Sequence, residues 1–237
     1  MPLFISEGPA DIPSGYRLGA DTRIRFSIQC GGLEMAPAFP QSAATRVAPA
    51  LPQSADNPGR LCGACRLHPP AFAYARAGAR YGDVVREALH AFKFGGRRAL
   101  AAPLGDLLAE AVQGGLPLGL PDLLVPVPLH PRRERERGFN QSSLVARRLG
   151  RAWGRPVRDD ILSRVVATPS QTALDAAARW ANVRGAFRLR RPELIAGRHV
   201  VVVDDILTTG ATLSECVRTL QQMGAATVGA LTVARVV

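Results

Sequence analysis

The sequence predicts an α/β fold with a mostly parallel, twisted sheet flanked by helices. The strongest indication is the unbroken apolar run at 200–203, which is typical of a strand buried on both faces. A second indication is the alternation of helical periodicity with short apolar runs from Ala71 onward. The chain of 237 residues, of which 47% are hydrophobic, is long enough for one core and a small appendage.

The spacing of apolar residues places the individual helices and strands. Helical spacing, in two cases ended by paired glycines, predicts four helices. They cover residues 84–92, 100–112, 144–152 and 213–223. Short apolar runs predict three strands, at 123–128, 200–203 and 227–236. Helices therefore alternate with buried strands, as in a parallel α/β sheet.

Residues 1–70 differ from the rest of the chain. They hold three of the four cysteines and many of the prolines, and no helical period persists in them. Residues 36–43 recur with small changes at 48–55, which indicates a local duplication rather than a repeat fold. Proline at this density favours an extended linker. We therefore divide the chain into an irregular arm at 1–70 and a folded domain at 71–237.

The chain is strongly basic. Its formal net charge is +11, which predicts a polyanionic partner such as a nucleic acid, a membrane surface or a phosphate-rich substrate. Arginine supplies 29 of the 30 cationic side chains, and Lys93 is the only lysine. A preference of this kind is typical of GC-rich coding, so the choice of arginine says little about function. The excess over 19 acidic side chains does indicate anion binding.

The sequence gives no sign of a membrane span or a secreted, disulfide-bonded protein. No apolar run approaches the length of a span, and the N-terminus lacks the charged start and apolar stretch of a signal peptide. Four cysteines are too few for a disulfide scaffold of this size. We therefore expect a cytoplasmic protein.

The sharpest motif is Asp204-Asp205, at the end of the apolar run and before a short loop and a helix. We expect both carboxylates at the carboxyl edge of the strand, outside the core, where α/β sheets bind ligands. The loop residues are Thr208, Thr209, Gly210, Ala211 and Thr212. Hydroxyls and amides at a helix N-terminus suit a phosphate, and carboxylates accept hydrogen bonds from sugar hydroxyls. The segment therefore predicts a site for a pentose 5-phosphate.

Residues 200–212 are also compatible with structures other than a sugar-phosphate site. In the simplest alternative, the acids cap a turn and Thr212 caps a helix that binds nothing. A Walker B strand also ends in acids, but it requires a GxxxxGK[ST] loop, and Lys93 does not lie in one. A GxGxxG dinucleotide turn is absent as well. The sequence thus excludes both nucleotide-binding alternatives.

Residues 200–212 resemble the ribose-5-phosphate signature of type I phosphoribosyltransferases. Further segments are similar to the ComF/GntX branch of that superfamily, which is associated with competence for DNA uptake. They are 81–96, 125–130, 137–141 and 182–187. The resemblance covers roughly residues 60–237 and implies the type I phosphoribosyltransferase fold.

The resemblance implies an enzyme that binds 5-phosphoribosyl 1-diphosphate with Mg²⁺ and transfers the phosphoribosyl group to an acceptor that the sequence does not identify. Asp204 and Asp205 would hold the ribose hydroxyls, and residues 208–212 would hold the 5-phosphate. Arg164 joins the two acids as a candidate catalytic residue. With Gln171, it lies in a segment that would form a flexible loop over the substrate. An ordinary surface loop is the alternative for that segment.

A basic segment follows the first predicted strand. By resemblance it is the pyrophosphate-binding loop, with Arg132, Arg133 and Arg137 as ligands, because guanidinium groups suit phosphate oxygens. The alternative is a solvated charge run in which Glu134 and Glu136 pair with the arginines on a helix face.

The arm resembles a degenerate zinc ribbon. Cys62 and Cys65 have the spacing of a ribbon knuckle, but Ser27 stands where the first cysteine of an upstream pair would lie. Cys30, Cys62 and Cys65 are one thiolate short of the usual four ligands, and His68 is a further candidate. Zinc binding and an arm that binds no metal both stay open.

A second function is compatible with the same residues. The chain would then be a competence factor without catalytic activity that binds single-stranded DNA or senses the sugar diphosphate. The positive charge favours this alternative, whereas an aromatic content of 5% provides few side chains on which bases could stack. Release of pyrophosphate in the presence of acceptors distinguishes the two functions.

Overall fold

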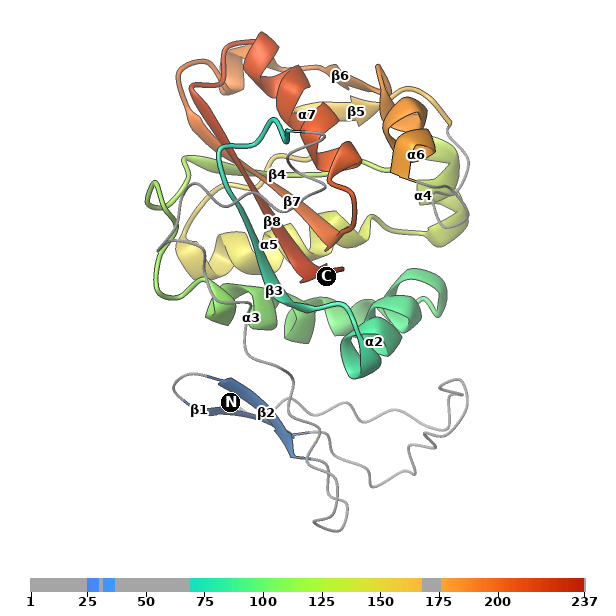
Figure 1. Cartoon of the computed structure of the whole chain (residues 1–237), viewed down its shortest axis with the longest axis vertical. Helices are drawn as coiled ribbons and strands as arrows, with labels where there is room; N and C mark the ends of the chain where they lie inside the picture. The colour runs from blue at the N-terminus through green and yellow to red at the C-terminus, as the bar shows by residue number, and fades with distance from the viewer. Residues whose placement is uncertain (1–24, 30–31, 37–68, 168–175, 237) are drawn as a thin grey trace.

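Four parallel strands form the central sheet, in the order β3-β8-β7-β4 (Figure 1). The computed structural model describes residues 25–29, 32–36, 69–167 and 176–236. The strands are β3 (Ala75–Arg80), β4 (Leu123–Pro126), β7 (His199–Leu207) and β8 (Thr227–Arg235). All neighbouring pairs in this sheet are parallel, which confirms the predicted fold class.

β7 lies inside the sheet, between β8 and β4. Residues 200–203 are fully buried, as their apolar run predicts. Pro126, the last residue of β4, pairs with Val203. Asp204 and Asp205 therefore belong to β7 but lie just past the end of β4, where the sheet edge opens.

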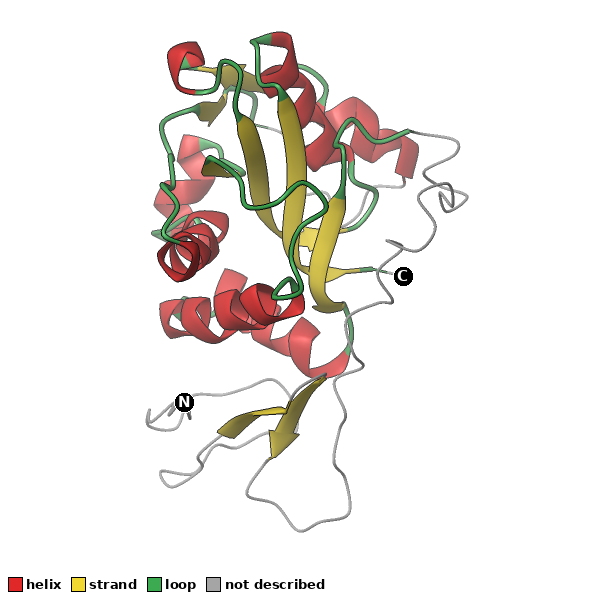
Figure 2. Cartoon of the chain, turned by 90° about the vertical axis from the view of Figure 1, so that its left-hand side faces the viewer, coloured by secondary structure: helices red, strands yellow, loops and turns green. Residues whose placement is uncertain are grey.

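Helices cover both faces of the sheet (Figure 2). The first face packs against three helices, α2 (Asp83–Phe94), α3 (Ala101–Ala111) and α5 (Gln141–Trp153). The second face packs against α7 (Ala211–Gln222), which contacts α6 (Ala176–Val183). It also packs against an antiparallel pair, β5 (Leu162–Arg164) and β6 (Phe187–Leu189). The four predicted helices are thus all present.

Several short elements complete the described chain. They are the 3-10 helices at Arg98–Leu100 and Pro192–Leu194, the helix α4 (Pro131–Arg137), and an antiparallel pair in the arm, β1 (Arg25–Gln29) and β2 (Gly32–Ala36). The zinc candidates of the arm lie outside the described residues; they are Cys30, Cys62, Cys65 and His68. Within the part of the chain that the structure describes, every helix falls short of the length and hydrophobicity of a membrane span.

β3 is the sheet strand that apolar spacing does not predict. Its sequence, Ala-Arg-Ala-Gly-Ala-Arg, has no β-branched or aromatic residue. Packing requires small residues there, since a Cβ on Gly78 would lie 2.9 Å from the carbonyl oxygen of Val233 and 3.2 Å from the Cα of Leu108 in α3. A close helix–strand contact therefore accounts for this sequence better than β-propensity does.

Candidate functional site

Asp205 is a buried carboxylate with partners from two helices. The residue is only 4% exposed. Its Oδ2 accepts a hydrogen bond from Nε2 of Gln141 at 3.0 Å and pairs with Nζ of Lys93 at 2.9 Å. Contrary to our expectation, Asp205 thus lies in the core rather than outside it. It is tolerated there because an ammonium and an amide compensate its charge.

Asp204 is more accessible and is held by α5. Its Oδ1 accepts hydrogen bonds from the Ser142 hydroxyl at 2.8 Å and from the backbone N–H of Asp205 at 2.9 Å. Burial and the neighbouring Asp205 charge raise the pKa of Asp204 to about 7, and Lys93 opposes that shift. Asp204 therefore changes its charge close to neutral pH.

The start of α5 fixes both acids. Asn140 is its N-cap: the Asn140 side chain accepts from the N–H of Ser142 at 3.0 Å and donates to the carbonyl of Val127 at 3.0 Å. This ties the helix to the chain just after β4 and points Gln141 and Ser142 at the acid pair. Sequence pattern alone indicates no role for Lys93, Gln141 or Ser142, although Lys93 and Gln141 lie in segments that carry the family resemblance.

The loop after β7 turns directly into α7, as predicted. Gly210 is the N-cap residue with φ of 78°, a left-handed conformation that favours glycine. Thr208 is exposed and Thr209 is half-buried, and the Thr209 hydroxyl accepts from the N–H of Ala211 at 3.4 Å. Residues 208–212 therefore place hydroxyls and the first amides of a twelve-residue helix next to the two acids.

The basic segment is a short helix, α4, in which two of the three expected arginines have different surroundings. Arg132 is 76% exposed and pairs with Glu136 at 2.9 Å, so the helix-face alternative describes this residue. Arg137 is half-buried, and its Nη1 donates to Oε1 of Gln141 at 2.6 Å. Burial lowers the pKa of Arg137, while the Asp205 charge raises it. Gln141 thus links Arg137 to Asp205.

The third expected element of the site, the flexible loop with Arg164 and Gln171, lies partly outside the described residues. Arg164 is the last residue of β5 rather than part of a loop, and it is 8% exposed. Its guanidinium lies 5.5 Å from the ring centre of Phe187 on β6. Burial lowers the pKa of Arg164, and the nearby charge of Arg133 lowers it further, while Asp204 acts in the opposite direction. Gln171 lies outside the described residues.

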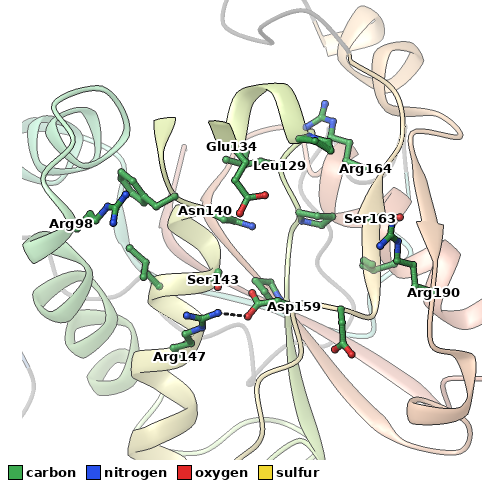
Figure 3. A pocket seen from close by; sticks show the side chains of 17 residues that line it. Arg98, Leu129, Glu134, Asn140, Ser143, Arg147, Asp159, Ser163, Arg164 and Arg190 are labelled. Carbon is green, nitrogen blue, oxygen red and sulfur yellow. Dashed lines mark hydrogen bonds and ion pairs between the residues drawn. The ribbon is translucent and has the colours of Figure 1, made fainter. Parts of the chain in front are cut away.

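A cavity of about 460 Å³ lies beside this site, between α5, the chain after β4, and β5 (Figure 3). Its charged lining residues are Arg98, Glu134, Arg147, Asp159, Asp160, Arg164 and Arg190. Arg147 pairs with Asp159 at 2.7 Å within it. Neither acid of β7 lines the cavity. Arg164 lines the cavity and also lies within electrostatic range of Asp204, so the cavity is adjacent to the site of the two acids.

No metal cage accompanies these residues. Among the described side chains, no three histidines, cysteines or acids gather where they could hold a metal ion. The two acids of β7 are already bonded to Lys93, Gln141 and Ser142. A divalent cation at this edge would therefore depend on ligand oxygens for most of its coordination.

Known proteins share much of this sequence. Residues 142–236 match the family model of the phosphoribosyl transferase domain. The chain is 39% identical over 179 residues to the DNA utilization protein YhgH of Salmonella typhi, covering 73% of this chain and 77% of that protein. It is 32% identical over 167 residues to competence protein F of Haemophilus influenzae, covering 69% and 73%. A solved glutamine phosphoribosylpyrophosphate amidotransferase from B. subtilis aligns at a TM-score of 0.39 and 21% identity, over 57% of this chain and 26% of that one.

Proposed function

Because the chain belongs to the ComF family of phosphoribosyltransferase-like proteins, we propose that it binds 5-phosphoribosyl 1-diphosphate and transfers the phosphoribosyl group to an acceptor. One observation carries the proposal: the acids of β7, the Gly210 turn and the start of α7 are contiguous at the carboxyl edge of a parallel sheet. A carboxylate pair and a helix N-terminus at that edge match the two ends of a pentose 5-phosphate.

The phosphate end of the ligand would lie on residues 208–212. The amides at the start of α7 donate to phosphate oxygens, and the helix dipole favours a negative charge there. Thr208 and Thr209 supply hydroxyl donors from the same turn. Gly210 keeps the backbone approachable because it adds no side chain at the turn.

The sugar end would lie on Asp204. This acid is more exposed than Asp205, and its carboxylate is held through Oδ1, which accepts from Ser142 and from the backbone of Asp205. Its ionised carboxylate would accept hydrogen bonds from the ribose hydroxyls. Asp205 is held by Lys93 and Gln141. It would fix the end of β7 and keep a negative charge there, while Asp204 makes the main contacts with the sugar.

The diphosphate leaving group would meet Arg137, which lies in the field of Asp205, and Arg164, which lies in that of Asp204. Arg133 is within electrostatic range of both arginines. Fixed positive charge where pyrophosphate develops its charge stabilises the transition state more than the bound substrate. Mg²⁺ would neutralise part of that charge while bound through the diphosphate oxygens. The zinc proposal for Cys30, Cys62 and Cys65 is independent of this site, and elemental analysis of the purified protein tests it.

A role in DNA uptake is the second part of the proposal. The relatives are named for DNA utilization and competence, and this chain carries a formal net charge of +11. A protein that binds single-stranded DNA or senses the sugar diphosphate without turnover would use the same fold and charge. We infer a function within competence or DNA uptake, and the transfer reaction is the sharper hypothesis to test first.

Calorimetric titration with 5-phosphoribosyl 1-diphosphate and Mg²⁺ tests the binding site. We expect saturable binding to the wild-type protein and none to the double variant Asp204→Asn/Asp205→Asn. The double variant Asp159→Asn/Asp160→Asn is the matched control, because these two adjacent acids are more exposed than Asp205 and each pairs with an arginine of its own. Equal affinity of the wild-type and the Asp204/Asp205 variant would refute the site. Pyrophosphate release with candidate acceptors then separates a transferase from a binding protein.

A further inference from the structure

The only lysine of the chain sits at the candidate site. Arginine supplies every other cationic side chain, yet at position 93 the chain has an ammonium. The Lys93 side chain is 20% exposed, and its Nζ lies 2.9 Å from Oδ2 of Asp205. A coding preference accounts for the arginines elsewhere, and this position departs from that preference.

The last turn of α2 contacts the site through three consecutive residues. The ring of Phe92 lies 5.5 Å from that of Phe139, Lys93 pairs with Asp205, and the ring of Phe94 lies 5.5 Å from the guanidinium of Arg137. Each of these contacts joins α2 to a different element of the site. α2 lies well before residues 142–236, which match the phosphoribosyl transferase domain.

We propose that Lys93 is a positioning residue that fixes the Asp205 carboxylate, and that the end of α2 is thereby part of the sugar-diphosphate site. This inference rests on the proposed function. Oδ2 of Asp205 is shared between Lys93 and Gln141, and the ammonium is a compact donor that fits beside the amide. The planar fork of an arginine would reach for both carboxylate oxygens and compete with Gln141. With Asp205 held in this way, Asp204 stays available for the sugar.

The charged and titratable groups around the pair come from every element that packs there. Lys93 belongs to α2, Arg137 to α4, Arg164 to β5 and Cys216 to α7, while α5 contributes the polar Gln141 and Ser142. Of these, Lys93 forms an ion pair with Asp205. It is the group whose removal should change the charge balance of the pair most.

The test compares Lys93→Met and Lys93→Arg with Arg86→Met, which removes an exposed cation from the same helix. Affinity for 5-phosphoribosyl 1-diphosphate is measured by calorimetry from pH 6 to 9 at constant Mg²⁺. We expect Lys93→Met to weaken binding at least tenfold and to move the pH midpoint of binding upward by about one unit, because Lys93 lowers the pKa of Asp204. Lys93→Arg should recover part of the affinity and return the midpoint toward that of the wild type.

The pH midpoint separates positioning from a merely structural role. A structural loss would lower the melting temperature without moving that midpoint. Wild-type affinity and midpoint in Lys93→Met would overturn the proposal, as would an equal loss in Arg86→Met.

A second measurement keeps the two proposals apart. If the wild-type protein binds no sugar diphosphate, the proposed function fails, and Lys93 is judged on the ligand-free protein by unfolding from pH 5 to 8. Loss of Lys93 should cost more stability at pH 8 than at pH 5, because Asp204, whose pKa is about 7, is ionised at pH 8 and is then stabilised by the Lys93 charge. A cost that does not change with pH would overturn the role of Lys93 on its own.

Discussion

Two charged segments follow neighbouring parallel strands, and the structure treats them differently. Asp204 and Asp205, at the end of β7, are bonded to side chains from α2 and α5. The arginines of α4, after β4, include Arg132, whose partner Glu136 lies one turn away on the same helix. A buried charge requires a partner from elsewhere in the fold, whereas an exposed charge is satisfied locally or by water. The two segments therefore differ mainly in whether their charged side chains are buried, and burial determines whether the partner comes from a distant part of the chain.

Arg137 is the exception within α4. It donates to Gln141, which donates in turn to Asp205, and its guanidinium lies over the ring of Phe94. This arginine belongs energetically with the acid pair, although it belongs to the basic segment in sequence. Variants that separate buried from exposed charges, and Arg137 from the rest of α4, test that division.

Asp205→Ala should destabilise the folded protein most. The substitution leaves the ammonium of Lys93 and the amide of Gln141 facing a site without an acceptor, which costs about 3 kcal/mol. Chemical denaturation measures it, and Asp160→Ala is the control, since Asp160 is a 45% exposed side chain that pairs with arginines. An exposed pair contributes at most about 1 kcal/mol. Equal losses in the two variants would show that Asp205 is no more constrained than a surface acid.

Arg137→Ala should weaken sugar-diphosphate binding about tenfold, equivalent to about 1.4 kcal/mol, because it removes a charge held next to Asp205. Arg132→Ala should change affinity less than twofold, since Arg132 is 76% exposed and paired with Glu136. Calorimetry on the two variants measures the difference. If Arg132→Ala has the larger effect, α4 binds the diphosphate through its exposed face and the division drawn here is wrong.

The acid segment was predictable because its strand is apolar on both faces up to the two acids, and a loop and a helix follow shortly after them. The side chains that bind the two acids could not be predicted from the sequence. Lys93 reaches Asp205 from a helix far away in the sequence, and no periodicity links the two positions. Gln141 and Ser142 act because Asn140 caps α5 against the chain after β4, which is a tertiary contact. The expectation that both acids lie outside the core failed for Asp205 because those partners make its burial possible.

In the basic segment, the sequence could not show which of the arginines belong to the site. Arg132, Arg133 and Arg137 are the same residue type within six positions, so composition alone ranks them equally. Their helix turns Arg132 outward and Arg137 toward Gln141, and only the helical phase relative to α2 and α5 separates them. β3 is a similar case, because close packing at Gly78 determines a strand that has no β-branched residue.

Asp204→Asn should change how stability depends on pH. The pKa of Asp204 is raised to about 7, so the folded protein holds this proton more tightly than the unfolded chain, and the contribution of Asp204 to stability falls as pH rises from about 4 to 7. Asparagine stays neutral and its Oδ1 can still accept from Ser142. We expect the variant to be more stable than wild type at pH 8 by about 1 kcal/mol, a rise of about 2–4 °C in Tm. A stability difference between variant and wild type that does not grow in favour of the variant over this range would contradict the raised pKa of Asp204.

The smallest expected effect concerns single-stranded DNA and the exposed face of α4. Arg132 and Arg135 are exposed, so a polyanion can reach them without disturbing Arg137 or the acids. Each phosphate contact adds about 0.7 to the slope of log affinity against log salt on single strands. The double variant Arg132→Ala/Arg135→Ala should therefore lower that slope by about 1.4 while sugar-diphosphate affinity stays within twofold of wild type.

Fluorescence anisotropy with an oligonucleotide across a salt series measures the slope. An unchanged slope would mean that DNA, if bound, lies elsewhere on the basic surface. Parallel loss of both ligands would mean that one arginine surface serves both, and that exposure does not divide α4 as the structure indicates.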